Sequence, residues 1–218
     1  MPQKHEVKQG EGIATIAKMF GFFRWENLWD DPMNRNLREK RNNPNVLYPG
    51  DVVSIPEREQ KEVDGSTEQC HRFVYRVPRM TETLRMKIED FDGAPMANKP
   101  FVLTLDDGTK YSGKTNGEGM LEGQVPVDAT SGTLEIEGNE WCLQINHLNP
   151  VDEKTSDDNV SGAQSRLNNL GFVCADTGVL DDATKAAIKA FQAQEEELKE
   201  TGELDEKTRR ALRKRHGC

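Results

Sequence analysis

The chain has 218 residues, of which 34% are apolar and 31% are charged, and its mean hydropathy is −0.79. A single large core needs more aliphatic and aromatic side chains than this, so we expect several small domains. The net charge of −9 argues against nucleic acid and anionic membrane surfaces as partners, because both are negatively charged. No segment approaches the 18 apolar residues that a membrane-spanning helix needs, so we expect no membrane insertion.

Two polar stretches divide the sequence into three predicted modules. Residues 58–69 and 149–157 contain few apolar side chains and are predicted to be linkers. They separate a first module at residues 1–57, a second at residues 70–148 and a third at residues 158–218. Residues 58–156 hold a net charge of −7 out of −9, so the acidic excess lies in the middle of the chain. The predicted fold class is multidomain α+β.

The first module reads as a strand, two helices and a second strand. Residues 6–8 form a short strand candidate, and apolar residues recur at helical spacing over residues 13–20. Gly21 stands where a glycine would end that helix. Residues 25–29 indicate a second helix, and residues 52–56 indicate a strand that ends at a proline. We expect the two strands to pair across the helices.

Residues 4–57 resemble a LysM module in three places: residues 7–13, residues 16–21 and residues 43–51. The segment 30–41 is longer than the family's usual second helix and its exit. The resemblance implies a βααβ fold that binds β-1,4-linked N-acetylglucosamine chains in a groove between two loops. That groove would use Gly10, Glu11, Gly12, Ile13, Asn43, Pro44, Asn45, Val46 and Leu47. In the alternative interpretation the glycines only form turns and the apolar residues only fill a small core.

The middle module shows about seven short strand signals separated by turn residues. They lie at residues 72–77, 84–88, 101–105, 110–113, 120–125, 133–136 and 141–145. This spacing predicts an antiparallel β-sandwich. The glycine- and asparagine-rich turns resemble those of immunoglobulin-like or prealbumin-like sandwiches. Residues 90–93 could be taken for a calcium loop, but the other ligand positions are missing, so a surface turn is preferred.

The third module contains an internal repeat. Residues 177–188 recur as residues 201–212, and each copy has a Thr-Gly turn followed by an aspartate placed to cap a helix. An earlier helix is predicted at residues 161–170 and would end at Gly171. The basic run at residues 213–215 suits the negative end of the last helix dipole. We therefore expect three helices within about 60 residues.

Residues 158–218 resemble a peptidoglycan-binding domain of the kind attached to cell-wall hydrolases. The resemblance rests on residues that include Gln164, the segment 170–172, the segment 191–192, Thr208 and Leu212. The first turn departs from the family pattern Asp-Gly-x-x-Gly. The resemblance implies glycan contacts at Thr177, Gly178, Asp181, Thr184 and Gln192.

Four cysteines allow three disulfide connectivities. Cys174 and Cys218 lie in the same module, and we predict that they pair. Cys70 and Cys142 are left open between a disulfide and two buried free thiols, and a reducing compartment would leave all four reduced. The scattered cysteines and histidines predict no metal site.

We find no constellation for catalysis. The sequence has no HExxH motif, no serine elbow and no oriented Cys-His-Asn set. We therefore expect a non-enzymatic protein without a cofactor, with a cell-wall hydrolase as the minor alternative.

The order of the three modules resembles accessory proteins found with type VI secretion spike (VgrG/PAAR) clusters. This resemblance implies a partner in peptidoglycan or another N-acetylglucosamine polymer, and possible contact with a spike or effector protein. The residues after Met1 lack the apolar segment of a signal peptide, so we expect cytoplasmic residence before delivery to the periplasm or cell wall. The alternative function is a structural adaptor that binds spike or effector proteins instead of sugar.

Overall fold

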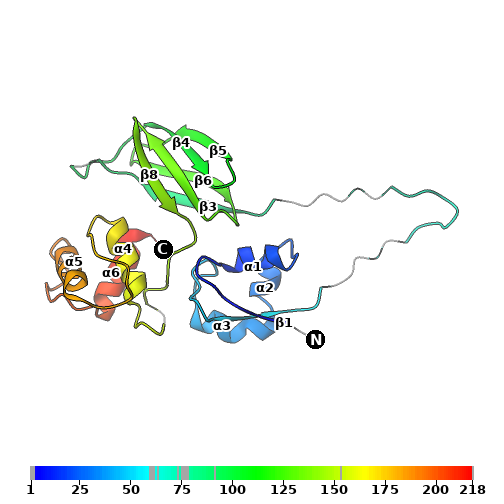
Figure 1. Cartoon of the computed structure of the whole chain (residues 1–218), viewed down its shortest axis with the longest axis horizontal. Coiled ribbons are helices and arrows are strands. Elements are labelled where there is room, and N and C mark those ends of the chain that lie inside the picture. The colour runs from blue at the N-terminus through cyan, green and yellow to red at the C-terminus, as the bar shows by residue number, and fades with distance from the viewer. Residues whose placement is uncertain are drawn as a thin grey trace. The chain divides into compact units, whose positions relative to one another are not determined.

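The computed structural model describes residues 3–58, 62, 64–72, 74, 79–90, 92–152 and 154–217. The chain divides into two compact units. One comprises residues 1–5, 13–34 and 53–146, and the other comprises residues 6–12, 35–52 and 147–218. These units do not coincide with the three predicted modules, because the first module contributes to both. Helices and antiparallel sheets occur together, so the predicted α+β class is confirmed (Figure 1).

The N-terminal strands pair as expected, although the first lies earlier than predicted. Strand β1 (Gln3–Glu6) and strand β2 (Val52–Ile55) form a two-stranded sheet. Backbone bonds continue the pairing to Val7, whose N–H donates to the carbonyl of Asp51 at 2.8 Å. Between the strands lie α1 (Ile13–Met19), α2 (Glu26–Trp29), the 3₁₀ helix η1 (Pro32–Asn34) and α3 (Arg35–Lys40). The long segment 30–41 is thus helical over most of its length.

Gly21 terminates the first helix, as its position predicts, and lies two residues after the last residue of α1. Gly21 has a φ of +74°, which glycine adopts without strain. The N–H of Phe22 donates to the carbonyl of Ala17 at 2.8 Å, and the N–H of Gly21 donates to that of Lys18 at 3.0 Å. These two bonds are the Schellman pattern. The buried face of α1 consists of Ile13, Ala14, Ile16 and Ala17.

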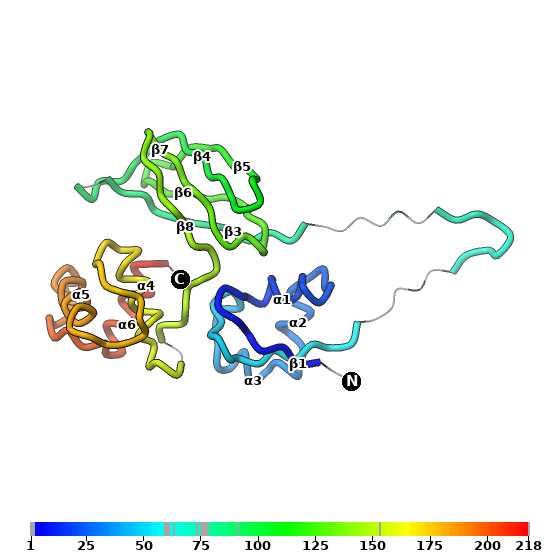
Figure 2. The backbone as a smooth tube through the Cα atoms, in the orientation of Figure 1, coloured from blue at the N-terminus to red at the C-terminus, as the bar shows by residue number. Residues whose placement is uncertain are grey.

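The middle of the chain contains two antiparallel sheets. Strands β3 (Thr81–Lys87) and β6 (Met120–Pro126) form one, and β5-β4-β7-β8 is the strand order of the other (Figure 2). The four strands of the second sheet are β4 (Pro100–Leu105), β5 (Lys110–Lys114), β7 (Ser131–Ile136) and β8 (Asn139–Gln144). One hydrophobic cluster contains residues of both sheets, among them Leu103, Leu121 and Leu134.

Six of the seven strand signals in the middle region correspond to strands of the structure. The seventh, at residues 72–77, falls largely outside the described residues. The likeness to immunoglobulin-like or prealbumin-like sandwiches stays a prediction. At the candidate calcium turn, Asp90 accepts the N–H groups of Asp92 at 3.0 Å and Ala94 at 2.9 Å. This carboxylate therefore closes a surface turn.

The C-terminal region has the three expected helices, α4 (Val160–Asn169), α5 (Asp182–Gln192) and α6 (Glu206–His216). Helix α4 contacts both α5 and α6. The shared core includes Leu167, Ile188, Phe191 and Leu212, each completely buried. No helix among the described residues is long and apolar enough to cross a membrane.

The segment predicted as the second linker packs into this region at its beginning. Val151 is only 1% exposed and belongs to the hydrophobic core of the three helices. A Cβ atom added to Gly162 on α4 would lie 2.0 Å from the carbonyl oxygen of Pro150, so glycine is required for this close approach. The buried Arg166 donates to the carbonyl of Asn149 at 2.7 Å. Residues 149–151 are thus part of the helical region, although their polar surroundings indicated a linker.

Candidate functional site

One buried glutamine holds the turn that precedes α5. Gln164 on α4 is completely buried. Its amide nitrogen donates to the hydroxyl of Thr184 at 2.8 Å and to the carbonyl of Val179 at 3.1 Å. Its amide oxygen accepts the N–H groups of Gly178 at 2.8 Å and Thr177 at 3.0 Å. Because a buried amide must satisfy its polar atoms, these bonds fix the shape of the turn.

A second glutamine repeats this arrangement before α6. Gln192 on α5 donates to the hydroxyl of Thr208 at 2.9 Å and to the carbonyl of Glu203 at 3.1 Å. Its oxygen accepts the N–H of Gly202 at 2.9 Å. The internal repeat is therefore structural as well as sequential, and each copy uses a glutamine from the preceding helix.

Both predicted helix caps are present. The carboxylate of Asp181 accepts the N–H of Thr184 at 2.7 Å, and that of Asp205 accepts the N–H of Thr208 at 2.8 Å. Hydrogen bonds from Thr184 hold the pKa of Asp181 below its usual value, and those from Thr208 do the same for Asp205. The charged carboxylates also suit the positive ends of the two helix dipoles.

The five glycan residues predicted in this region do not share one environment. Thr184 and Gln192 are 0% and 2% exposed, so neither side chain can touch a glycan chain. Their position in the core corrects the expectation of ligand contact and gives them a structural role. Thr177 is exposed, while Gly178 and Asp181 are half-buried. Of the predicted set, only these three reach the surface.

The residues that follow the first Thr-Gly turn are exposed apolar side chains. Val179 is 61% exposed and Leu180 is 37% exposed. Their counterparts in the second copy are the exposed Glu203 and Leu204, which is only 8% exposed. We call Thr177, Gly178, Val179 and Leu180 the first-turn surface. The sequence analysis did not predict Val179 and Leu180 as site residues. The signal was present, because the internal repeat aligns the apolar Val179 with the charged Glu203.

The two loops predicted to form the N-terminal groove do lie together. A Cβ atom on Gly12 would be 3.3 Å from Cα of Asn45, so the loops are in backbone contact. Ile13 and Leu47, however, are 0% and 5% exposed and belong to the interior. Glu11 accepts the N–H of Lys8 at 2.9 Å within its own turn. Gly12 is buried as well. The exposed or half-buried members of the predicted groove are Gly10, Glu11, Asn43, Pro44, Asn45 and Val46.

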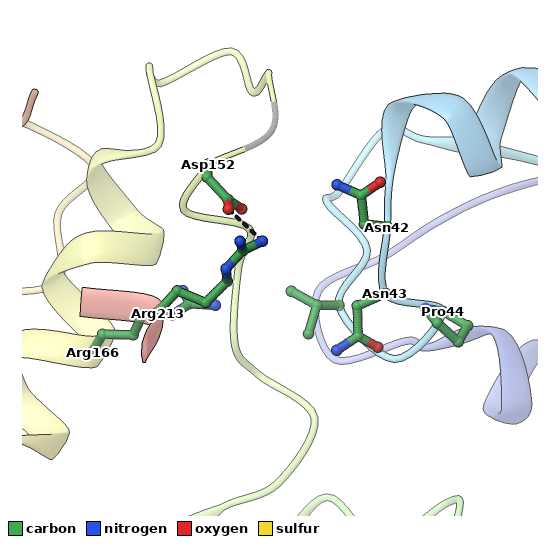
Figure 3. A pocket seen from close by; sticks show the side chains of 7 residues that line it. Asn42, Asn43, Pro44, Asp152, Arg166 and Arg213 are labelled. Carbon is green, nitrogen blue, oxygen red and sulfur yellow. Dashed lines mark ion pairs between the residues drawn. The ribbon is translucent and has the colours of Figure 1, made fainter. Parts of the chain in front are cut away.

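A cavity of about 280 Å³ adjoins the second of these loops. Figure 3 shows the side chains of Asn42, Asn43 and Pro44 on one wall, with Asp152, Arg166 and Arg213 on the other. Arg213 forms an ion pair with Asp152, and the two side chains are 45% and 22% exposed. All lining residues belong to the same compact unit, and they are Asn42, Asn43, Pro44, Val46, Asp152, Arg166 and Arg213.

A buried ion pair supports the base of this loop. Arg41 and Asp51 are 0% and 3% exposed, and Nε of Arg41 donates to the carboxylate of Asp51 at 2.7 Å. Lys40 adds a bond at 2.6 Å and the N–H of Tyr48 adds one at 3.0 Å. Burial alone would raise the pKa of Asp51, but hydrogen bonds from Arg41 and Lys40 outweigh it and hold the pKa below its usual value.

The cysteines differ in accessibility. Cys70 and Cys142 are free and exposed. The structure therefore has free thiols in place of a disulfide, but they are not buried as the second alternative expected. Cys174 is a free, buried thiol, so the structure does not contain the predicted bond to Cys218, which itself lies outside the described residues. Within the part of the chain that the structure describes, no group of three or more His, Cys, Asp or Glu side chains could hold a metal ion.

The family comparison concerns the C-terminal region. Residues 156–212 match the family model described as "Putative peptidoglycan binding domain". This part of the chain is therefore similar to that family. The match includes both Thr-Gly turns and covers 57 of the 218 residues. No curated protein and no solved structure shows significant similarity to the chain. The resemblance of residues 4–57 to LysM modules stays a prediction.

Proposed function

We propose that the chain is a non-catalytic peptidoglycan-binding protein and that the first-turn surface makes the central contact. The main support is the family match over residues 156–212. The exposure of Val179 and Leu180, at a turn whose second copy buries or charges the same positions, favours the first turn over the second. Exposed apolar side chains suit the apolar faces and acetamide methyl groups of N-acetyl sugars.

The turn also offers polar groups in a fixed arrangement. The hydroxyl oxygen of Thr177 accepts bonds from the N–H of Val179 at 3.2 Å and from Gln164 at 3.3 Å. Its own proton is therefore directed elsewhere and can be donated to a sugar oxygen. Because Gln164 holds the turn in place, little conformational entropy would be lost on binding.

The N-terminal region would add a second contact to the same polymer. We base this on the LysM resemblance and on the contact between the loops at Gly12 and Asn45. Two weak contacts on one chain raise avidity for a polymeric wall. The burial of Ile13 and Leu47 means that these two side chains fill the interior and take no part in this contact. The alternative is a structural adaptor in which this region binds protein instead of sugar.

The biological setting is part of the proposal. The order of the regions resembles accessory proteins of type VI secretion, which would be made in the cytoplasm and delivered to the cell wall by the secretion apparatus. A spike or effector protein would then be a second partner.

Co-sedimentation of the full chain with purified, insoluble peptidoglycan tests the proposal. Val179→Glu copies the second repeat into the first turn, and we expect it to lower the bound fraction several-fold. Glu203→Gln, at the matching exposed position of the second turn, is the control and should bind as the wild type does. A wild-type chain that stays in the supernatant would contradict the proposal, as would equal binding by Val179→Glu. Release of soluble muropeptides would contradict the non-catalytic assignment.

A further inference from the structure

We propose that the cavity beside residues 42–46 is a second ligand site, which binds the carboxylate of a small acylated unit. The site would be separate from the first-turn surface. It is formed by a loop of the N-terminal region and by side chains of the C-terminal region, which lie in one compact unit. With a volume of about 280 Å³, it accommodates roughly one sugar residue or a dipeptide, so the carboxylate-bearing end of a larger ligand would enter it.

The charges around the cavity favour an anion. Two arginines and one aspartate line it, so the lining carries a net positive charge. The side chain of Arg213 is 45% exposed and reachable from solvent. A guanidinium group matches a carboxylate in shape and can donate two parallel hydrogen bonds to it. Asp152 now pairs with Arg213 and would share it, or give it up, when a ligand carboxylate binds.

The opposite wall provides groups for an acylated amine. Asn43 uses its side-chain oxygen within the loop, where it accepts the N–H of Asn45 at 2.9 Å. Its amide nitrogen is thereby left on the side of the cavity, as Figure 3 shows. Pro44 and Val46 add apolar surface next to it. An amide donor beside apolar surface suits the oxygen and methyl group of an acetamide or a peptide.

Hydrogen bonds hold the two walls together. Arg41, one residue before the loop, donates to the carbonyl of Lys154 at 2.7 Å. Gln9 donates to the side-chain oxygen of Asn149 at 3.2 Å, and the carbonyl of Asn149 accepts from Arg166 at 2.7 Å. The cavity is therefore formed before ligand arrives, which lowers the cost of binding.

The identity of the ligand as a fragment of peptidoglycan rests on the proposed function. Within peptidoglycan, the unit that joins an N-acetyl group, a peptide and carboxylates is the N-acetylmuramyl peptide. A chain of N-acetylglucosamine alone is neutral and offers no partner to Arg213. We therefore expect the cavity to distinguish muramyl peptides from chitin oligomers.

Isothermal titration of the full chain with muramyl dipeptide tests the site. We expect saturable binding, at least tenfold weaker for Arg213→Met. Arg210→Met removes the same charge from an exposed position of the same helix and should change the affinity less than twofold. Asp152→Asn removes the competing carboxylate and should tighten binding several-fold. Tetra-N-acetylchitotetraose and the methyl ester of muramyl dipeptide should bind at least tenfold more weakly than the acid.

Other results would overturn the inference. These are absence of saturable binding to the wild type, equal losses in Arg213→Met and Arg210→Met, weaker binding by Asp152→Asn, or equal affinity for the ester. Sedimentation with whole peptidoglycan keeps the two proposals distinguishable. A chain that sediments but ignores muramyl dipeptide would refute this site only, whereas binding of the dipeptide without sedimentation would refute the proposed function.

Discussion

Replacing Gln164 with methionine tests whether this one side chain maintains the first turn. Methionine has nearly the same length and volume, so the substitution removes hydrogen bonds without leaving a large cavity. The side chain is completely buried and bonds to Thr184, Val179, Thr177 and Gly178. Thr184 is itself 0% exposed, so its hydroxyl has no access to water in the folded state.

The cost can be estimated from the groups that lose their partner. A buried polar group left without a hydrogen bond costs about 1–3 kcal/mol. The N–H groups of Thr177 and Gly178 lie near the surface and can in part bond to water. We therefore expect Gln164→Met to lower the stability of the C-terminal region by about 3 kcal/mol, which corresponds to about a hundredfold in an opening equilibrium. Gln192→Met should cost somewhat less, because Gln192 accepts one backbone N–H where Gln164 accepts two.

Hydrogen exchange of the full chain, read by mass spectrometry, is the appropriate assay, because residues 149–218 contain no tryptophan. Peptides covering α4, the first turn and α5 should exchange about a hundredfold faster in Gln164→Met. Lys189→Ala, at an exposed position of α5, is the control and should leave exchange within about twofold. Unchanged exchange around residues 177–184 would refute the role assigned to Gln164.

Three further predictions follow from buried or exposed groups elsewhere. Arg41→Met leaves Asp51 buried without its main partner and should lower the free energy of unfolding in urea by about 3–5 kcal/mol, whereas Arg35→Met, at an exposed ion pair, should lower it by less than about 0.5 kcal/mol. Because the pKa of Asp51 is lowered in the fold, the stability that Asp51 contributes should be lost as pH falls through that pKa. A contribution that grew on acidification would count against the pair. Burial raises the pKa of Glu82 to about 7, so its neutral form is favoured in the fold and stability should decline as pH rises from about 4.5 through 7. Urea unfolding at pH 8 should show Glu82→Gln more stable by roughly 2 kcal/mol, with little difference at pH 4, and equal stability at pH 8 would contradict the burial. Maleimide should label Cys70 and Cys142 in the native chain but Cys174 only after unfolding, as peptide mass spectrometry would detect. The reason is that burial shields the Cys174 thiol and raises its pKa. Rapid labelling of Cys174 in the native chain would disprove this.

Local sequence signals located most helices and most strands of the described residues, but they did not predict η1 and α3. Asp181 and Asp205 predict the starts of their helices because a capping carboxylate bonds to an N–H only three residues away. Gly21 predicts the end of α1 because glycine adopts the positive φ that ends a helix. The strand pairing of β1 with β2 was accessible because both strands flank the helices in sequence order. Such short-range rules need no knowledge of the tertiary structure.

The candidate sites depend on contacts that local patterns do not encode. Gln192 and Thr184 are polar and would be expected at the surface from sequence alone. In the structure each is buried and hydrogen-bonded to a residue of a neighbouring helix, Gln192 to Thr208 and Thr184 to Gln164. The cavity brings residues 42–46 next to Asp152 and Arg213, more than 100 positions away along the chain. The sequence predicts a linker at residues 149–157 because polar residues outnumber apolar ones there, yet Asn149, Pro150 and Val151 are all buried.

The most direct test of the central claim locates the peptidoglycan contact on the full chain. Hydrogen exchange with and without soluble peptidoglycan fragments compares the two Thr-Gly turns within one molecule, so each serves as the reference for the other. We predict slower exchange at residues 177–181 in the presence of fragments and no change at residues 201–205. Equal protection of both turns, or protection of neither, would contradict binding through the first-turn surface.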